Sequence, residues 1–268
     1  MIILSPSLVA QLGADPNVNN PVIGYRNLVT TANITATTQA EGFPATNLAN
    51  PATDLLWVAD PSGDEYLTVA IADSDPVDYV GIARHNLGSA QIPVSIEGDD
   101  GSGWSELVGE TLLADDKPVI FRWEPQSLAG VRVRMQEGSA PPEAAVLYVG
   151  RLLVIPRRIY VGHTPMPYGR EVTVINGVSE SGNFLGRIVV GETRSTSVSL
   201  KNLDPAWYRQ HMDPFVAAGA ESPFFWAWRP GTYPYETGFG WFPGGVPRPT
   251  NDRPNGMMAI DFDLRGVA

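Results

Sequence analysis

The three histidines are the first residues that could do chemistry, because an imidazole can act as a base or bind a metal. His85 follows Arg84 at the end of an expected strand, His163 lies in a loop, and His211 lies on an expected helix. No two of them have the close spacing of a helical metal site, and none lies near a Gly-x-Ser-x-Gly motif. His85 is the best candidate for a functional role, with structural hydrogen bonding at a strand end as the simpler interpretation.

Acidic residues are the second group that could bind a ligand. The segments "DSD" (73–75) and "EGDDGSG" (97–103) offer carboxylate oxygens to calcium, but both lack the glutamate that closes an EF-hand loop. The chain has no cysteine, which excludes disulfides and zinc–thiolate sites, and it carries no Walker or dinucleotide motif. A glycosidase needs two carboxylates facing a sugar, and no motif indicates such a pair. We therefore expect no catalytic residue, no metal, no cofactor and no enzymatic activity.

Tryptophan carries the strongest chemical signal, with seven residues in the chain. An exposed indole stacks on a sugar ring, whereas a buried one belongs to a core. Trp123 lies inside an alternating strand and is expected in the core, but Trp57 and Trp104 flank turns. The candidate glycan-binding residues are Trp57, Arg84, His85 and Trp104.

The segment "SPFFWAWRP" (222–230) concentrates four aromatic side chains between two prolines. Strand alternation places Phe224, Trp226 and Trp228 on one side and Phe225 and Ala227 on the other, so that both faces are apolar. A strand of this kind is normally covered by two layers. We rank a core strand with one face at a subunit contact first, a core strand alone second, and a ligand platform third.

The predicted subunit contact extends into the loop-like segment 233–256, which is rich in Pro and Gly and too long for a tight connection. Arg229 stands where the strand meets this loop and suits a carboxylate or aromatic partner. The candidate interface residues are Phe225, Trp226, Trp228, Arg229, Phe239, Trp241 and Phe242.

Charge divides the chain into two parts. The formal net charge is −11, and residues 1–155 contribute −12 whereas residues 156–268 contribute +1. The acidic balance argues against nucleic acid as a partner. The N-terminus has no basic start and the longest apolar run is interrupted by Arg151, so we expect no signal peptide, no membrane insertion and synthesis in the cytoplasm. We further expect residues 156–268 to mediate assembly, because the neutral part keeps like charges away from a packed interface.

The hydrophobic pattern is typical of a mainly β protein. Short runs bounded by turn residues, such as 65–71, 77–83, 92–98, 118–123, 130–135 and 145–155, predict a two-sheet sandwich. A second β-rich domain with one short helix follows, and Asp204 and Pro205 mark the helix start. The expected divisions are an N-terminal arm or first strand (1–30), a β-sandwich (31–155) and a β-rich assembly domain (156–268).

The segment 41–89 resembles the first half of a galactose-binding-like, discoidin-type jelly-roll sandwich, in which a small residue and "NL" lead through a loop to a Trp and two strands. Together with "LYVGRLLVIPR", "SGNFLGR" and "SPFFWAWRP", the order of segments resembles tail proteins of tailed bacteriophages and prophages. The resemblance implies a structural virion protein at the tail tip or baseplate. Such a protein would form a ring or collar of several copies and contact other tail proteins.

Two hypotheses follow. The first is a structural protein of a phage tail, located in the virion. The alternative is a carbohydrate-binding protein that recognises a host surface glycan through the N-terminal sandwich.

Overall fold

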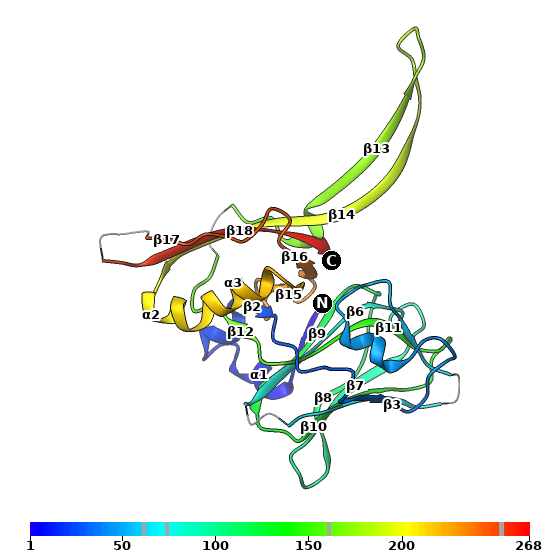
Figure 1. Cartoon of the computed structure of the whole chain (residues 1–268), viewed down its shortest axis with the longest axis vertical. Helices are drawn as coiled ribbons and strands as arrows, with labels where there is room; N and C mark the ends of the chain where they lie inside the picture. Colours follow the sequence, from blue (N-terminus) through cyan, green and yellow to red (C-terminus); the bar gives the residue numbers. More distant parts are fainter. Residues whose placement is uncertain (61–62, 73–74, 160–161, 252–254) are drawn as a thin grey trace.

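The alternating runs of the first half form two five-stranded sheets that face each other (Figure 1). The computed structural model describes residues 1–60, 63–72, 75–159, 162–251 and 255–268. The inner sheet has the strand order β1 (Ile2–Leu4), β9 (Val119–Gln126), β6 (Val77–His85), β11 (Glu143–Gly150) and β4 (Trp57–Val58). The outer sheet has the order β3 (Ile34–Ala36), β5 (Glu65–Ala70), β10 (Gly130–Met135), β7 (Pro93–Asp99) and β8 (Trp104–Leu112).

The strand pattern explains this sandwich. In β5 and β10 every second side chain is buried, and the side chains between them are more open to solvent. The chain passes repeatedly between the two sheets, because β6, β9 and β11 belong to the inner sheet and β5, β7, β8 and β10 to the outer one, as in a jelly roll. A single apolar core fills the space between the sheets and includes Leu67, Val131 and Phe121. The predicted mainly β fold with a jelly-roll sandwich is confirmed.

The inner sheet differs from the outer one because both of its faces are covered. Seven successive residues of β6, Val77 to Ala83, are buried. One face packs on the outer sheet, and the other packs on a third sheet through a second apolar cluster that includes Tyr79, Ile120 and Tyr148. β6 therefore has no face that is open to solvent along these seven residues.

The third sheet, here called the C-terminal sheet, has the order β12 (Leu153–Val154), β2 (Val22–Gly24), β15 (Phe224–Ala227), β16 (Thr237–Trp241), β18 (Met258–Val267), β14 (Phe184–Leu203) and β13 (Arg170–Val178), with β17 (Thr250–Asn251) beside β18. Its other face carries α2 (Pro205–Trp207), a π-helical turn (Tyr208–Met212) and α3 (Asp213–Gly219). Shorter helical turns are α1 (Pro6–Gln11) and 3-10 turns at Pro16–Asn19, Ala45–Ala49 and Met166–Tyr168. The second part is thus also β-rich with a short helical segment, as predicted.

The segment "SPFFWAWRP" is a core strand with both faces buried inside one chain. Phe224 and Trp226 face the helices, and Phe225 and Ala227 face the inner sheet. Phe225 lies so close to β6 that a Cβ on Gly81 would be 2.6 Å from its ring, which explains a glycine there. Both apolar faces are therefore satisfied without a second subunit.

Residues 1–30 contribute to two sheets. β1 pairs in parallel with β9 of the inner sheet, whereas β2 pairs with β15 and β12 of the C-terminal sheet. The last run of the first half also divides, because β11 stays in the inner sheet and β12 joins the C-terminal one. The two halves are consequently held together by the N-terminal segment as well as by the apolar cluster between the sheets.

Asp204 caps the helical segment, and its removal should be measurable. Its carboxylate accepts hydrogen bonds from the backbone N–H groups of Ala206 and Trp207, both at 2.9 Å. We expect Asp204→Ala to lower the free energy of unfolding by about 1 kcal/mol in urea denaturation, because two orphan donors lose their acceptor. Asp213→Ala is the matched control, since the helix runs through Asp213 without a side-chain cap. Equal losses for the two variants would contradict the capping role.

Candidate functional site

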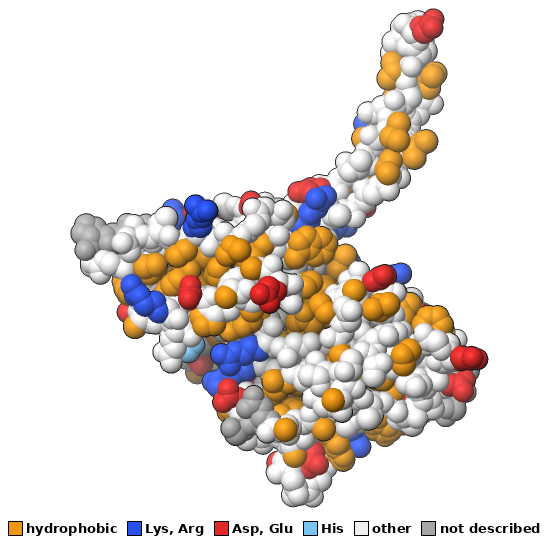
Figure 2. Space-filling view, in the orientation of Figure 1, with side chains coloured by type: hydrophobic (Ala, Val, Ile, Leu, Met, Phe, Trp, Pro, Cys, Tyr) orange, Lys and Arg blue, Asp and Glu red, His pale blue; other side chains and the backbone are white. Residues whose placement is uncertain are grey.

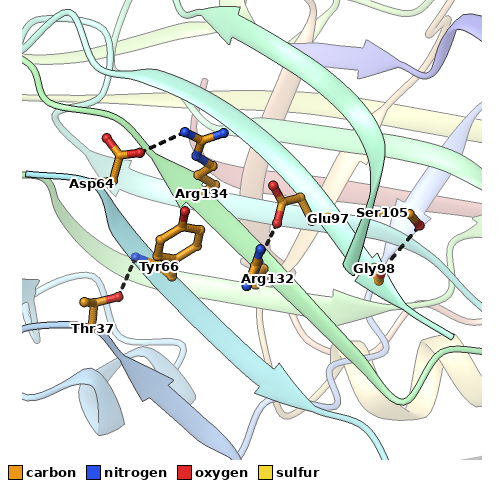
Figure 3. Close-up of polar contacts among 8 residues, drawn as sticks. All are labelled: Thr37, Asp64, Tyr66, Glu97, Gly98, Ser105, Arg132 and Arg134. Carbon is orange, nitrogen blue, oxygen red and sulfur yellow. Dashed lines mark hydrogen bonds and ion pairs between the residues drawn. The ribbon is translucent and has the colours of Figure 1, made fainter. Parts of the chain in front are cut away.

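The solvent-facing side of the outer sheet gathers charged and aromatic residues from β5, β10, β7 and β8, and Figure 3 shows Tyr66, Arg132, Arg134 and Glu97 among them. The register sets Arg132 of β10 between Thr68 of β5 and Glu97 of β7. Two pairs further along, Arg134 lies opposite Tyr66. Alternation turns these side chains to solvent, while Val131 and Val133, which alternate with the arginines, are buried. We call this surface the outer face.

Arg132 is the centre of the outer face. Its guanidinium carbon lies 4.6 Å from the centroid of the Tyr66 ring and 4.4 Å from that of Trp104, so the cation contacts two aromatic rings. It also forms an ion pair with the carboxylate of Glu97. The indole of Trp104 lies over Gly130, where a Cβ would be 3.1 Å from the ring, so that glycine lets the ring approach the sheet. Trp104 remains 38% exposed.

A second ion pair extends the outer face beside Tyr66. The Arg134 guanidinium donates to the Asp64 carboxylate at 2.8 Å, and this hydrogen bond raises the pKa of Arg134 above its ordinary value. The hydroxyl oxygen of Thr37 accepts a hydrogen bond from the backbone N–H of Tyr66 at 3.0 Å. These contacts fix the polar groups around the two rings before any ligand arrives.

The chemistry of the outer face follows from its composition. Two aromatic rings on a flat sheet can cover the apolar face of a flat ring molecule. Arginine supplies only donors and carboxylate supplies only acceptors, so the two ion pairs offer both kinds of partner to hydroxyl groups. The face therefore suits an uncharged or zwitterionic polyhydroxylated ligand better than a strongly charged one, because each cation already has an anionic partner.

Trp57 and His85 are core residues, which corrects their assignment to a glycan site. Trp57 is 0% exposed, and its indole N–H donates to the Thr38 carbonyl at 3.1 Å. The Nε2 atom of His85 bonds the Lys117 carbonyl at 2.9 Å, and its Nδ1 accepts from the backbone N–H of Leu87. Burial lowers the pKa of His85 to about 4. The strand-end interpretation of this histidine therefore accounts for all of its polar atoms.

The structure does not bring the four candidate glycan residues together. Arg84 is exposed at the end of β6 with a φ of 55°, and it belongs with Trp57 and His85 to the inner sheet. Trp104 alone stands on the outer sheet. Of the four, only Trp104 lies on the outer face.

The candidate interface residues separate into buried and accessible ones. Phe225, Trp226 and Phe239 are core residues and leave no surface for a partner, because the inner sheet and the helices cover them. The accessible members are Trp228, Arg229, Trp241 and Phe242. For these four, a role in assembly stays a prediction.

Three of the accessible interface candidates already have aromatic partners within the chain. Trp228 stacks on Tyr233 with ring centroids 5.4 Å apart, and the Arg229 guanidinium lies 5.6 Å from the Trp228 ring. Phe242 packs edge-on against Phe224 at 5.1 Å. Trp241 is the most open of the set, at 42% exposed.

In the acidic turn at 97–103, the aspartate carboxylates accept hydrogen bonds from residues of the same turn. Asp99 accepts from the N–H groups of Gly101 and Gly103, and Asp100 accepts from the backbone and hydroxyl of Ser102, whose hydrogen bonds lower the pKa of Asp100. In the other acidic segment, Asp73 and Ser74 lie outside the described residues. Within the described part of the chain, no group of three His, Asp or Glu side chains is arranged to hold a metal ion, and no helix is long and apolar enough to cross a membrane.

Sequence reasoning missed Tyr66, Arg132, Arg134 and Glu97. The alternation of 65–71 and 130–135 was the available signal, because it places Tyr66 and both arginines on the wet side of their strands. The alternation does not predict which strands are neighbours. β5 and β10 pair in the sheet although about sixty residues separate them in the chain.

Comparisons with known proteins reach only part of the chain. No family model and no curated protein matches the sequence. Chitosan-binding module 1 from a chitosanase/glucanase of Paenibacillus sp. IK-5 is 17% identical, with a TM-score of 0.41, and the match covers 46% of this chain and 98% of the module.

Two family 32 carbohydrate-binding modules of Clostridium perfringens give similar figures. The NanJ module, solved with galactose, is 13% identical over 47% of this chain and 98% of its own, with a TM-score of 0.40. The GH89 module, solved with GalNAc-β-1,3-galactose, is 14% identical over 44% and 93%, with a TM-score of 0.39. The strand order of the chain itself makes it a mainly β protein built on a jelly-roll sandwich, and the function is inferred from its own residues.

Proposed function

We propose that this chain is a carbohydrate-binding protein that holds a glycan on the outer face. The observation that carries the proposal is the alignment of Tyr66, Arg132 and Trp104 on the solvent-facing side of one sheet. The Trp104 indole offers an exposed ring on which a sugar can stack, and the Arg132–Glu97 and Arg134–Asp64 pairs offer donors and acceptors to its hydroxyl groups. The proposed role is binding without catalysis.

A glycan array probed with the whole chain tests this proposal. We expect saturable binding to at least one glycan, and Trp104→Ala should weaken it at least roughly tenfold, equivalent to ~1.4 kcal/mol, because the stacking surface is lost. Trp241→Ala is the matched control, since Trp241 is exposed to a similar extent but belongs to the C-terminal sheet. No binding by the wild type, or equal loss in both variants, would overturn the proposal. Incubating a bound glycan with the protein and finding cleavage would contradict the non-catalytic role.

The second candidate function is a structural subunit of a phage tail, as the order of segments implies. One observation favours a role in assembly, namely the exposed apolar hairpin formed by β13 and β14. Detection of the chain in purified phage particles by mass spectrometry tests this candidate. Its absence from particles whose genome encodes it would exclude a virion role.

A further inference from the structure

The hairpin of β13 and β14 projects from the body as a two-stranded ribbon (Figure 1). β18 pairs with β14 only from Arg194 to Leu203, so β14 before Arg194 has β13 on one side and, among the described residues, no strand on the other. β13 is the last strand of its sheet, and its second edge is also unpaired within the described chain. We call residues 170–194 the arm. A two-stranded hairpin alone is at best marginally stable in water.

The arm exposes large apolar side chains on both of its faces. Cross-strand partners share a face, so Ile175 and Ile188 lie on one face while Val174 and Val189 lie on the other. Figure 2 shows these hydrophobic groups along the shaft. Eight large apolar residues of the arm are 44% to 70% exposed, namely Val172, Ile175, Val178, Phe184, Leu185, Ile188, Val189 and Val190. Apolar surface gathered in this way marks a site of interaction.

We propose that two copies of this chain associate through their arms, apolar face against apolar face. The exposed apolar side chains on the two faces of one arm together present on the order of 800 Å², about what one partner contributes to a standard protein interface, so a single face offers roughly half of that area. Elsewhere in the described chain, exposed large apolar residues are spread over several segments, and the longest run of them is Tyr233, Tyr235, Trp241 and Val246. The arm of a second copy matches an arm in shape, because both are projecting two-stranded ribbons with apolar faces.

The charges agree with this pairing. The arm contains three basic residues (Arg170, Arg187, Arg194) and three acidic ones (Glu171, Glu180, Glu192), so its net charge is zero and the rest of the chain carries the whole −11. Two acidic bodies repel each other, and contact through projecting neutral arms keeps them apart. Arg187 is also held within the arm, where it donates to the Asn176 side chain at 2.8 Å.

The tip of the arm argues against a lipid membrane as the partner. The turn closes through a hydrogen bond from the Ser179 N–H to the Asn183 carbonyl and one from the Asn183 N–H to the Ser179 hydroxyl, and the intervening residues are Glu180, Ser181 and Gly182. An acidic, polar tip would have to enter the bilayer first. The free-energy cost of burying these groups in lipid is not removed by the apolar residues along the rest of the arm. The apolar groups lie along the sides of the ribbon, where a second ribbon can cover them.

Cross-linking tests the pairing directly, because the chain has no cysteine and any introduced thiol is unique. We expect Ile188→Cys, on the shaft of the arm, to give a covalent dimer with a bis-maleimide at micromolar protein. Leu112→Cys is the control, since Leu112 is equally open but lies at the end of β8 in the sandwich. No cross-linked dimer from Ile188→Cys, or equal yields from both positions, would overturn the proposal.

Solution mass provides the second measurement. The wild-type chain should sediment as a dimer or larger species, and the triple variant Phe184→Thr, Leu185→Thr, Ile188→Thr should sediment as a monomer, because threonine keeps the strand propensity and removes the apolar surface. Tryptophan fluorescence checks that the body stays folded, since no tryptophan lies in the arm. A monomeric wild type overturns the proposal, and so does wild-type flotation with lipid vesicles that the triple variant loses.

Discussion

Replacing Phe225 by alanine should lower the free energy of unfolding by about 4 kcal/mol, within the range for large buried aromatic side chains. Phe225 is fully buried between the inner sheet and the C-terminal sheet. Its ring meets Tyr148 edge-on at 5.5 Å and Phe239 at 4.8 Å, and it rests against the backbone of Gly81. These neighbours come from two different sheets, so the cavity cannot close without moving one sheet toward the other.

Equilibrium denaturation in urea measures this loss, and Phe43→Ala serves as the matched control. Phe43 is the same residue type but is exposed, so its truncation should cost well under 1 kcal/mol, as surface substitutions generally do. A loss below 1 kcal/mol for Phe225→Ala would show that the two sheets do not depend on this contact. Phe225→Leu should recover part of the lost stability, because leucine refills some of the cavity.

The sequence predicted the fold class because the sandwich depends on local patterns. Two kinds of short segment carried the prediction, and the structure contains both. The strands at 65–71 and 130–135 alternate in burial, and a helix starts at Asp204–Pro205. The C-terminal sheet covering the inner sheet was not predictable in this way. The sequence shows that β6 and β15 are apolar on both faces. It does not predict that these two strands pack against each other. A second subunit was therefore the simplest way to cover "FFWA".

The candidate site was predictable only in part, for the same reason. Trp57 and Trp104 both stand beside turns, yet Trp57 turns inward to bond Thr38 and Trp104 lies across Gly130 on the surface. Whether an indole beside a turn is buried depends on what the neighbouring strands leave open, and strand order is a property of the whole fold. Arg132 illustrates the same limit, since its contacts to Tyr66 and Trp104 join β10 to strands from both sides of it in the sheet.

The second large effect concerns acid, since His85 should make the fold less stable as the pH falls from about 6.5 to 4. Burial lowers the pKa of His85 to about 4 in the folded chain, against 6.5 when it is free, although the Lys117 carbonyl and the Asp116 carboxylate favour the charged form. Between pH 6.5 and pH 4, His85 is protonated in the unfolded chain but remains neutral in the folded chain. The stability contributed by neutral His85 is therefore complete above pH 6.5 and lost as the pH falls, by about 3 kcal/mol in total.

Asp78 changes the pH dependence of stability in the opposite direction, so its effect must be distinguished from that of His85. Burial raises the pKa of Asp78 to about 6, so the folded chain holds a proton that the unfolded chain releases between pH 3.8 and 6, and stability from this group falls as the pH rises. Urea denaturation of the wild type and of His85→Gln at intervals from pH 4 to 7 isolates the histidine, because Asp78 is common to both chains. The difference in unfolding free energy between the two should shrink by about 3 kcal/mol on going to pH 4. A difference that is independent of pH would mean that His85 accepts a proton in the folded chain as readily as in the unfolded one.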